Sequence, residues 1–412
     1  MSKGGRRFAA PALAVALLLL LAAPALAADR FAEPGGDGPF PCASSDPCSL
    51  ENAVSTAQAG DAVRPSAGTY NVSSTLELPV NVSLEASASD VVVNSTAATA
   101  LRVVASSPDS VVRRIELNHN PSSGSPEIGL ELLSGWAFQV TVTSNGDTAC
   151  LVNGAITTAL MSDSICHNNS SGPGVAISST SAADASRGEI FSVTAVSDNG
   201  YGLFASATAP GADVDLVGGD VIAQGAITDQ RGFNSSTTST SSEITLSSSN
   251  FNTLDFTPPT GATGTDSSVN DNQSALPLLD SDLRQLPGSP TINAGALFSQ
   301  TPPVDIDGDE RPQGAAVDIG ADEAEGDPPD TAIDAKPKKR TRKRTARFRF
   351  SSTEPADATF ECRIDAKPFA PCSSPKTYRN LKRGRHTFQV QSTDGFFNLD
   401  ATPAKYSWKV RR

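Results

Sequence analysis

The stretch Phe138-Gln139-Val140-Thr141-Val142-Thr143-Ser144-Asn145 is a β-prone run that ends in an asparagine-containing turn, and it decides the fold because it recurs. Further copies lie at residues 113–120, 161–168, 193–199 and 245–252, and a degenerate copy with glutamine in place of asparagine lies at 217–224. A second short strand follows each of the first five copies. These second strands begin at residues 129, 149, 174, 202 and 226, so they are 20, 25, 28 and 24 residues apart.

A period of this size, with strands and no helix in each unit, predicts an all-β solenoid from about residue 42 to residue 325. One coil cannot bury its own apolar face, whereas stacked coils lie about 4.8 Å apart and place like side chains over like. Turn asparagines are then expected to hydrogen-bond along the axis. A β-sandwich with coincidental spacing is the alternative, but sandwiches do not show this long-range recurrence. We expect one internal column, formed by Ile115, Val140, Ile165 and Val193.

Residues 49–57 are the one helix candidate in this part of the chain. Ser49 is suited to cap such a helix, because its side-chain oxygen can accept a hydrogen bond from a free N–H of the first turn. Leu50, Ala53, Val54 and Ala57 fall on one face. We expect this helix to cover the open end of the solenoid.

Two groups of motifs bracket the solenoid and carry a resemblance to known families. Residues 49–53, 59–63 and 67–70 resemble the opening coil of pectate-lyase-like right-handed β-helix proteins. Residues 288–295, 304–312 and 317–323 resemble the closing coil of "choice-of-anchor" β-helix surface proteins. The resemblance implies a right-handed parallel β-helix. Such folds often host polysaccharide lyases and glycoside hydrolases, but a fold alone does not determine function.

The first residues have the features of an export signal. Lys3, Arg6 and Arg7 precede an apolar run at 12–23, and Ala25-Leu26-Ala27 offers a cleavage site. This predicts a signal peptide at 1–27 and a short N-terminal segment of the mature protein at 28–41. A membrane anchor is the alternative, but the apolar run is shorter than the roughly 20 residues that span a bilayer. We therefore expect an extracellular or cell-wall-associated protein that is peripheral rather than transmembrane.

The six cysteines form three pairs that are close in sequence. In an oxidising compartment this arrangement predicts the disulfides Cys42–Cys48, Cys150–Cys166 and Cys362–Cys372. Metal binding is the alternative, but no pair has the two-residue spacing of zinc sites.

Charge divides the chain in two. Residues 331–412 contain 20 Lys and Arg against 7 Asp and Glu, a net charge of +13, whereas the whole chain carries −13, which leaves −26 for residues 1–330. Such a change of sign marks a domain boundary. We place a linker at 326–335 and a basic domain at 336–412, whose runs of alternating apolar and polar residues predict a small antiparallel β-sandwich.

This basic domain resembles the Ig-like modules appended to actinobacterial secreted proteins. The resemblance rests on residues 360–365, 368–375, 384–388 and 393–395, and the sequence departs from that pattern at Phe396-Phe397. The run at 336–344 is the densest cluster of positive charge. A solvated surface is one interpretation of the run, and binding to anionic wall polymers or acidic polysaccharide is the other, whereas nucleic-acid binding is disfavoured because no aromatic residues interleave the charges. The candidate anion-binding residues are Lys338, Lys339, Arg340, Arg342, Lys343 and Arg344.

Asp305, Asp307, Asp309 and Asp318 form a candidate Ca²⁺ site, since carboxylate oxygens are the ligands that Ca²⁺ prefers. Structural closing turns that pair with Arg311 are the alternative. The remaining acidic residues of the solenoid do not recur at one coil position, so we assign no catalytic residue. Apart from Ca²⁺, no cofactor is expected.

These observations favour an exported, non-catalytic protein, expected to be a monomer. Its β-helix would present a surface for a glycan or another partner, and its basic module would attach it to cell-wall polymers or extracellular polysaccharide, with no role for nucleic acid. The alternative is a polysaccharide lyase or glycoside hydrolase on the same β-helix.

Overall fold

The computed structural model describes most of the chain after the predicted signal peptide, which apart from Ala27 lies outside the described residues. The described residues are 27–412 without 88–89, 105–108, 123–125, 155–158, 181–184, 235–240, 257–262, 267–271, 302, 315, 325–328, 354–357, 395–397 and 401. Phe396 and Phe397, where the sequence departs from the Ig-like pattern, fall in these gaps.

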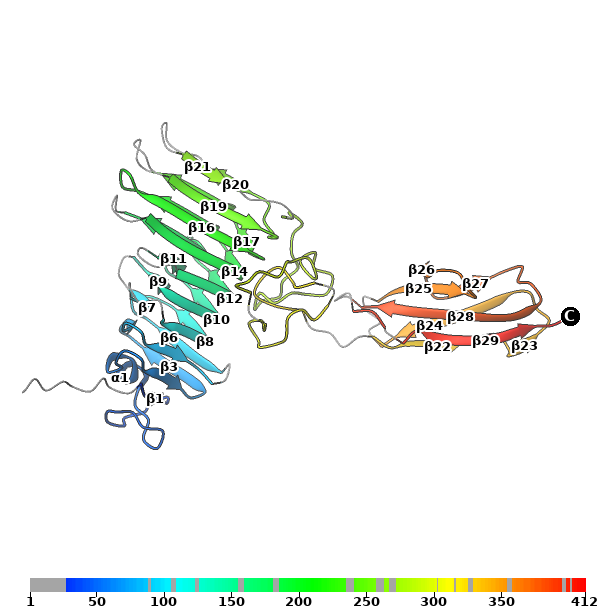
Figure 1. Ribbon diagram of the computed structural model, residues 1–412, viewed down its shortest axis with the longest axis horizontal. Coiled ribbons are helices and arrows are strands. Elements are labelled where there is room, and N and C mark those ends of the chain that lie inside the picture. The colour runs from blue at the N-terminus through cyan, green and yellow to red at the C-terminus, as the bar shows by residue number, and fades with distance from the viewer. Residues whose placement is uncertain are drawn as a thin grey trace, which may run out of the picture.

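Two parallel sheets wind around a common core (Figure 1). The 13-stranded sheet consists of β1 (Asp29–Ala32), β2 (Ala62–Pro65), β3 (Gly68–Val72), β5 (Ser83–Glu85), β6 (Val91–Ser95), β8 (Val111–His119), β10 (Gly135–Ser144), β12 (Ala159–Asn168), β14 (Ala185–Ser197), β16 (Asp213–Gly219), β17 (Ile222–Gly225), β19 (Ser241–Ser247) and β21 (Thr263–Asp266). The 8-stranded sheet consists of β4 (Leu76–Leu78), β7 (Thr99–Val103), β9 (Ile128–Leu132), β11 (Thr148–Val152), β13 (Val175–Ser179), β15 (Tyr201–Ala207), β18 (Thr228–Asn234) and β20 (Leu254–Phe256). Successive coils pair in parallel, so the predicted right-handed parallel β-helix is confirmed.

The 13-stranded sheet is bent once per coil. From β8 onward the bend falls at one residue of each coil that has a positive φ, between 42° and 58°, although none of these residues is glycine. The strand register places these residues above one another, because the residues on either side are paired from coil to coil. We call them the bend column: Arg114, Gln139, Asp163, Ser192, Asp220 and Ser248.

Apolar side chains stack in columns inside the β-helix. One continuous column contains Leu117, Val142, Cys166, Ala195 and Ala223, all buried. Along the outer turns, the Asn118 side chain donates to Asn94 and that of Asn145 donates to Asn120, as the repeat predicts.

The predicted column of Ile115, Val140, Ile165 and Val193 is wrong at one position. Val140 pairs with Ile115, but Ile165 pairs with Thr141 and Thr194, and Ser164 is the residue that pairs with Val193. The reason is the neighbouring Cys166, which points inward to form its disulfide with Cys150. Since successive side chains of a strand point to opposite faces, Ile165 must point outward.

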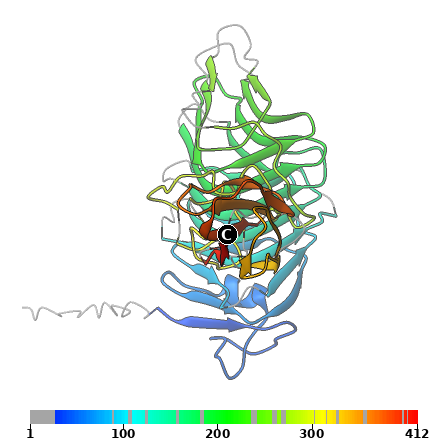
Figure 2. The same ribbon diagram turned by 90° about the vertical axis from the view of Figure 1, so that its right-hand side faces the viewer.

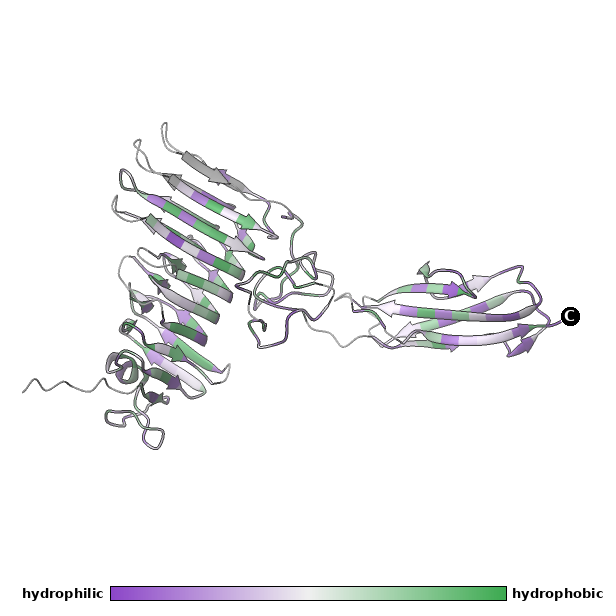
Figure 3. Cartoon of the chain, in the orientation of Figure 1, coloured by the Kyte–Doolittle hydropathy of each residue, from purple (hydrophilic) through white to green (hydrophobic). Residues whose placement is uncertain are grey.

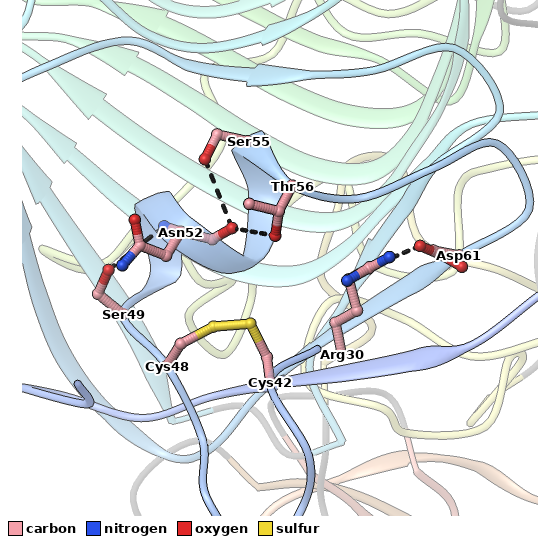
Figure 4. Close-up of a disulfide and its surroundings, with 8 residues drawn as sticks. All are labelled: Arg30, Cys42, Cys48, Ser49, Asn52, Ser55, Thr56 and Asp61. Carbon is pink, nitrogen blue, oxygen red and sulfur yellow. Dashed lines mark hydrogen bonds and ion pairs between the residues drawn. A yellow bond between two sulfur atoms is a disulfide. The ribbon is translucent and has the colours of Figure 1, made fainter. Parts of the chain in front are cut away.

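The N-terminal end is covered by α1 (Leu50–Ser55), close to the helix predicted at 49–57. Ser49 accepts a hydrogen bond from the Asn52 N–H at 3.3 Å, and Leu50, Ala53 and Val54 are buried. Figure 4 shows the Cys42–Cys48 disulfide beside this helix and the buried ion pair of Arg30 with Asp61. Arg30 belongs to β1, so the β-helix begins before the predicted boundary at residue 42.

Residues 276–324, which we call the cover segment, do not close the end of the β-helix as the resemblance implied. They fold back over the outer surface of the middle coils, where Figures 1 and 2 show them as the yellow loops on the side of the C-terminal domain. The physical reason is that these coils carry apolar side chains on the outside. Phe298 lies 5.5 Å from Phe191, measured between ring centroids, and Ile306 packs on Ile165.

The C-terminal domain is a sandwich of two sheets. The 3-stranded sheet contains β22 (Thr331–Ala335), β24 (Ala346–Ser352) and β27 (Lys376–Tyr378), and the 5-stranded sheet contains β23 (Arg340–Thr341), β29 (Ala404–Val410), β28 (Gly384–Thr393), β25 (Thr359–Ile364) and β26 (Ala370–Cys372). Strands of both sheets enclose Phe348, Phe388 and Trp408, and the alternation of green and purple along them in Figure 3 reflects one buried and one exposed face. The Ig-like resemblance stays a prediction. Of the predicted linker, 326–328 lie outside the described residues and 331–335 form β22.

All three predicted disulfides are present. Cys42–Cys48 closes a loop at the N-terminal cap, Cys150–Cys166 joins β11 to β12 through the interior of the β-helix, and Cys362–Cys372 joins β25 to β26. Among the described helices, none combines the length and apolar character that crossing a membrane would require.

Candidate functional site

The cover segment is held to the β-helix by a buried cluster of charges. Arg311 lies between two carboxylates, with its Nη1 3.1 Å from Glu323 Oε2 and its Nε 3.2 Å from Asp163 Oδ1 in the bend column. The guanidinium also donates to the carbonyl oxygens of Asp318 and Gly320. The side chains of Arg311 and Asp163 have no exposed surface, so this cluster fastens the segment and is closed to a ligand.

The acidic groups of this cluster resist ionisation. Burial raises the pKa of Asp163 to about 8, although the Arg311 charge opposes the shift, and burial also raises the pKa of Glu323. One guanidinium cannot neutralise two buried carboxylates, so a proton on one of them lowers the cost of burying the excess negative charge. Asp220, the next bend-column acid, accepts from the Ala296 N–H, and burial raises its pKa to about 7.

An aromatic groove of about 440 Å³ opens beside the cover segment, between β8, β10 and β12 on one side and residues 299–301, 303 and 304 on the other. Trp136 and Phe138 lie on the outer face of β10 with their ring centroids 5.5 Å apart in an edge-on arrangement. Trp136 is 46% exposed, a large apolar surface left open to solvent. Polar groups border the rings, since Arg113 donates through Nε to the Gln139 side-chain oxygen at 3.2 Å.

This groove has the composition of a site for a ligand that is partly apolar and partly polar. Small-molecule sites are mostly apolar with a few fixed polar groups, and aromatic rings supply rigid contact area. A pyranose ring offers such a surface, because its C–H faces are apolar and its edge carries hydroxyls. Among the described residues that line the groove, none has a carboxylate or imidazole group.

A polar cleft of about 400 Å³ lies on the other side of the cover segment. Glu116 comes from β8 and His167 from β12, while Arg284 and Asp307 come from the cover segment, 168 and 191 residues after Glu116 by subtraction. Arg284 Nη2 lies 2.8 Å from Asp307 Oδ1. Burial raises the pKa of Asp307, with Arg284 opposing the shift. With Asp282 also in the lining, the cleft contains three carboxylates, an imidazole and a guanidinium.

The candidate Ca²⁺ residues are only partly brought together. The acidic oxygen cluster of the structure contains Asp305 and Asp307, with Asp322 in place of the predicted Asp309 and Asp318, and its three oxygens lie within 4.8 Å of one another. Asp305 already accepts backbone N–H groups of residues 307, 308, 309 and 323.

Asp318 is occupied in the same way as Asp305. Its carboxylate accepts the N–H groups of Asn293 and Ala324 and the side-chain amide of Gln285. The Ca²⁺ site stays a prediction, with Asp305, Asp307 and Asp322 as the carboxylates that the structure brings together and Arg284 beside Asp307.

The candidate anion-binding run lies on the surface of the C-terminal domain. Arg340 lies in β23, which pairs with β29, and Arg344 Nε donates to the Leu381 carbonyl oxygen at 2.7 Å. The others are exposed outside strands: Lys338, Lys339, Arg342 and Lys343.

The sequence analysis missed Trp136, Glu116 and Arg284. Only Trp136 has a signal in the sequence, because it is one of two tryptophans and lies one residue before Ala137. Ala137 points into the core of the β-helix, so the neighbouring Trp136 side chain points outward. Glu116 and Arg284 become functional candidates only through the fold, which places the cover segment on the coil that carries Glu116.

Comparisons with known proteins were made on sequence and on structure. No family model matches the chain, and no curated protein matches it. Among solved structures, the pectate lyase Pel9A is 15% identical, with 73% of this chain and 97% of that chain covered and a TM-score of 0.40. A pectin methylesterase from Aspergillus niger, in a penultimately deglycosylated form, is 12% identical, with 63% of this chain and 94% of that chain covered and a TM-score of 0.29. The assignment of a parallel β-helix rests on the strand pairing of this chain itself.

Proposed function

We propose that this protein is an exported, non-catalytic glycan-binding protein of the cell surface or extracellular space. The β-helix holds a saccharide in the aromatic groove, and the basic C-terminal domain attaches the protein peripherally to an anionic polymer. The observation that carries the proposal is the exposed Trp136 ring beside Phe138, bordered by the Arg113–Gln139 pair. Three disulfides also agree with an oxidising compartment, where such bonds persist.

The binding test uses residues 28–412 on a glycan array, followed by titration with the best saccharide. Replacing Trp136 by alanine is expected to weaken binding about tenfold, because removing an aromatic anchor from the centre of a site costs on the order of 1.4 kcal/mol or more. Stability should change little, since the ring is half exposed. Val80→Ala is the matched control, because Val80 is a similarly exposed apolar residue of the β-helix at a turn outside the groove. Equal affinities for Trp136→Ala and the parent protein would contradict the proposal.

The polar cleft supports a second candidate, a polysaccharide lyase or glycoside hydrolase. The observation behind it is that Glu116 and Asp307 line the same cleft as Arg284, since glycoside hydrolysis uses a pair of carboxylates. Release of reducing ends or unsaturated products from polyuronides would favour this candidate if Asp307→Asn or Glu116→Gln abolished it while Trp136→Ala left some activity. No product release from any polyuronide would favour binding alone.

A further inference from the structure

The outward face of the 5-stranded sheet in the C-terminal domain is strongly basic. Along β28 and β29 the side chains that point inward are buried, among them Phe388 and Trp408, so the alternate residues point outward. These outward residues include Arg385, Lys405 and Lys409, which are all exposed. In Figure 1 the strands β25, β28 and β29 run side by side through this domain.

The strand register arranges the positive charges in two rows. In the first row Arg340 of β23 pairs with Lys409 of β29, which in turn pairs with Arg385 of β28. In the second row Lys405 pairs with Gln389, which pairs with Arg363 of β25. Neighbouring strands lie about 4.8 Å apart, and the four residue steps from Lys405 to Lys409 span about 14 Å along the strand.

Hydroxyl groups occupy the space between the two rows. Ser407 and Thr387 are paired across β29 and β28, and their side-chain oxygens lie 2.9 Å apart. Gln389 adds an amide, whose oxygen accepts from Arg363 Nε at 3.0 Å. The face therefore alternates positive charge with neutral groups that donate and accept hydrogen bonds.

In the described part of the domain no ion pair takes up any of the five cations of this face, and the carboxylate of Glu361 on the same face accepts from the Gln391 side-chain amide. The ion pair that forms there is the one between His386 and Asp365, and none of the five cations takes part in it. Asp365 also accepts the Thr387 N–H, so both of its oxygens are engaged. Like charges opposite one another destabilise a sheet, and a polyanion laid across them would relieve that repulsion.

We propose that this face binds a linear polysaccharide that carries carboxylates. The inference deepens the proposed function, on which it rests, by naming the attachment surface and its ligand class. Arginine matches carboxylate geometry, and the row of hydroxyl and amide groups suits the hydroxyls of a sugar chain, which a polyphosphate lacks. Of the candidate residues predicted from sequence, Arg340 is the one that strand pairing places on the face, and the other five lie outside the strands.

Two variants with equal loss of charge test the assignment. The face variant carries Arg385→Gln, Lys405→Gln and Lys409→Gln, and the run variant carries Lys338→Gln, Lys339→Gln and Lys343→Gln. All six side chains are exposed, so both variants should stay folded, and the face variant should melt no lower than the parent because it relieves like-charge repulsion; a thermal melt checks this. Binding of residues 28–412 to polygalacturonate, to sodium polyphosphate and to neutral dextran is measured at about 50 and about 300 mM salt, a range over which screening changes strongly.

The parent protein should bind polygalacturonate more tightly than polyphosphate and should not bind dextran through this domain. The face variant should lose at least tenfold in affinity for polygalacturonate at low salt and should show a weaker salt dependence, whereas the run variant should lose less than about threefold. Equal losses in both variants, a larger loss in the run variant, or tighter binding to polyphosphate would overturn the inference. The groove is judged separately, because the effect of Trp136→Ala on array ligands does not depend on the face variant.

Discussion

Replacing Asp163 by asparagine removes the ionisable group beneath the cover segment and should change how stability depends on pH. The pKa of Asp163 is about 8 in the fold, mainly through burial, against 3.8 in an exposed chain. From about pH 4 to about pH 8 the native state therefore holds a proton that the unfolded state has released, and native stability falls as the pH rises. The slope is at most about 1.4 kcal/mol per pH unit.

The Asp163→Asn variant has no such proton, so its native stability should increase relative to that of the parent protein as the pH rises. Between pH 5 and pH 7 the difference in stability between the variant and the parent should grow by about 3 kcal/mol, and it should level off above pH 8. Hydrogen exchange of amides in residues 304–323, corrected for the intrinsic effect of pH, measures the opening free energy of the cover segment directly. The same measurement on peptides of the C-terminal domain serves as the internal control.

Arg311, the ion-pair partner of Asp163, allows a second test of this pH dependence. Arg311→Met removes the cation beside Glu323 and the protonated Asp163. It leaves the Glu323 carboxylate without its cation and should destabilise the cover segment by about 3 to 5 kcal/mol at neutral pH. Adding Asp163→Asn to that variant should recover part of the loss. A difference between Asp163→Asn and the parent that stays constant from pH 5 to pH 8 would refute the argument, because it would mean that Asp163 remains ionised and paired with Arg311 throughout.

Three further outcomes follow from the structure. Replacing Cys150 and Cys166 together by serine opens a link between residues 16 apart and should cost about 3 kcal/mol in the unfolding free energy of the β-helix, measured by urea denaturation. Gly219→Ala would place a methyl group 2.4 Å from the Phe298 ring, and it should lower the opening free energy of the cover segment, measured by hydrogen exchange, by about 1 to 3 kcal/mol. If the clash is the cause, adding Phe298→Ala to the same chain should not lower it further. In the C-terminal domain burial alone would raise the pKa of Asp400, but hydrogen bonds from Thr331 and Thr402 hold the pKa below 3.8. The stability of the domain should therefore fall as the pH drops below about 4. Asp400→Asn should lack that loss in an acid titration followed by NMR.

The repeat in the sequence was sufficient to predict the β-helix because coil stacking depends on a local pattern. Each unit contains the strands and turn residues of one coil, and the unit recurs at about the length that one coil needs. Likewise the helix at 49–57 follows from its own capping residue and apolar face, and the close cysteine pairs need little chain between them to meet. These features depend on neighbours in sequence.

The register of Ile165 shows where a local pattern becomes ambiguous. Both faces of β12 are buried, one by the interior of the β-helix and the other by the cover segment, so an apolar residue is compatible with either side. The alternation of side chains along the strand then does not show which face of β12 points into the β-helix. The inward position of Cys166 settles the direction, and a disulfide through the interior could have been used as that constraint.

The sequence by itself therefore determined the winding, the cap, the disulfides and the separation into an acidic and a basic domain. Only the tertiary structure decided that the cover segment lies along the outside of the coils, that Arg284 and Asp307 line one cleft with Glu116, and that Arg340, Lys409 and Arg385 form one row. The physical reason is distance along the chain. Contacts between residues far apart depend on the path of the backbone and on which exposed apolar surface it covers, and neither is encoded in the spacing of any one segment.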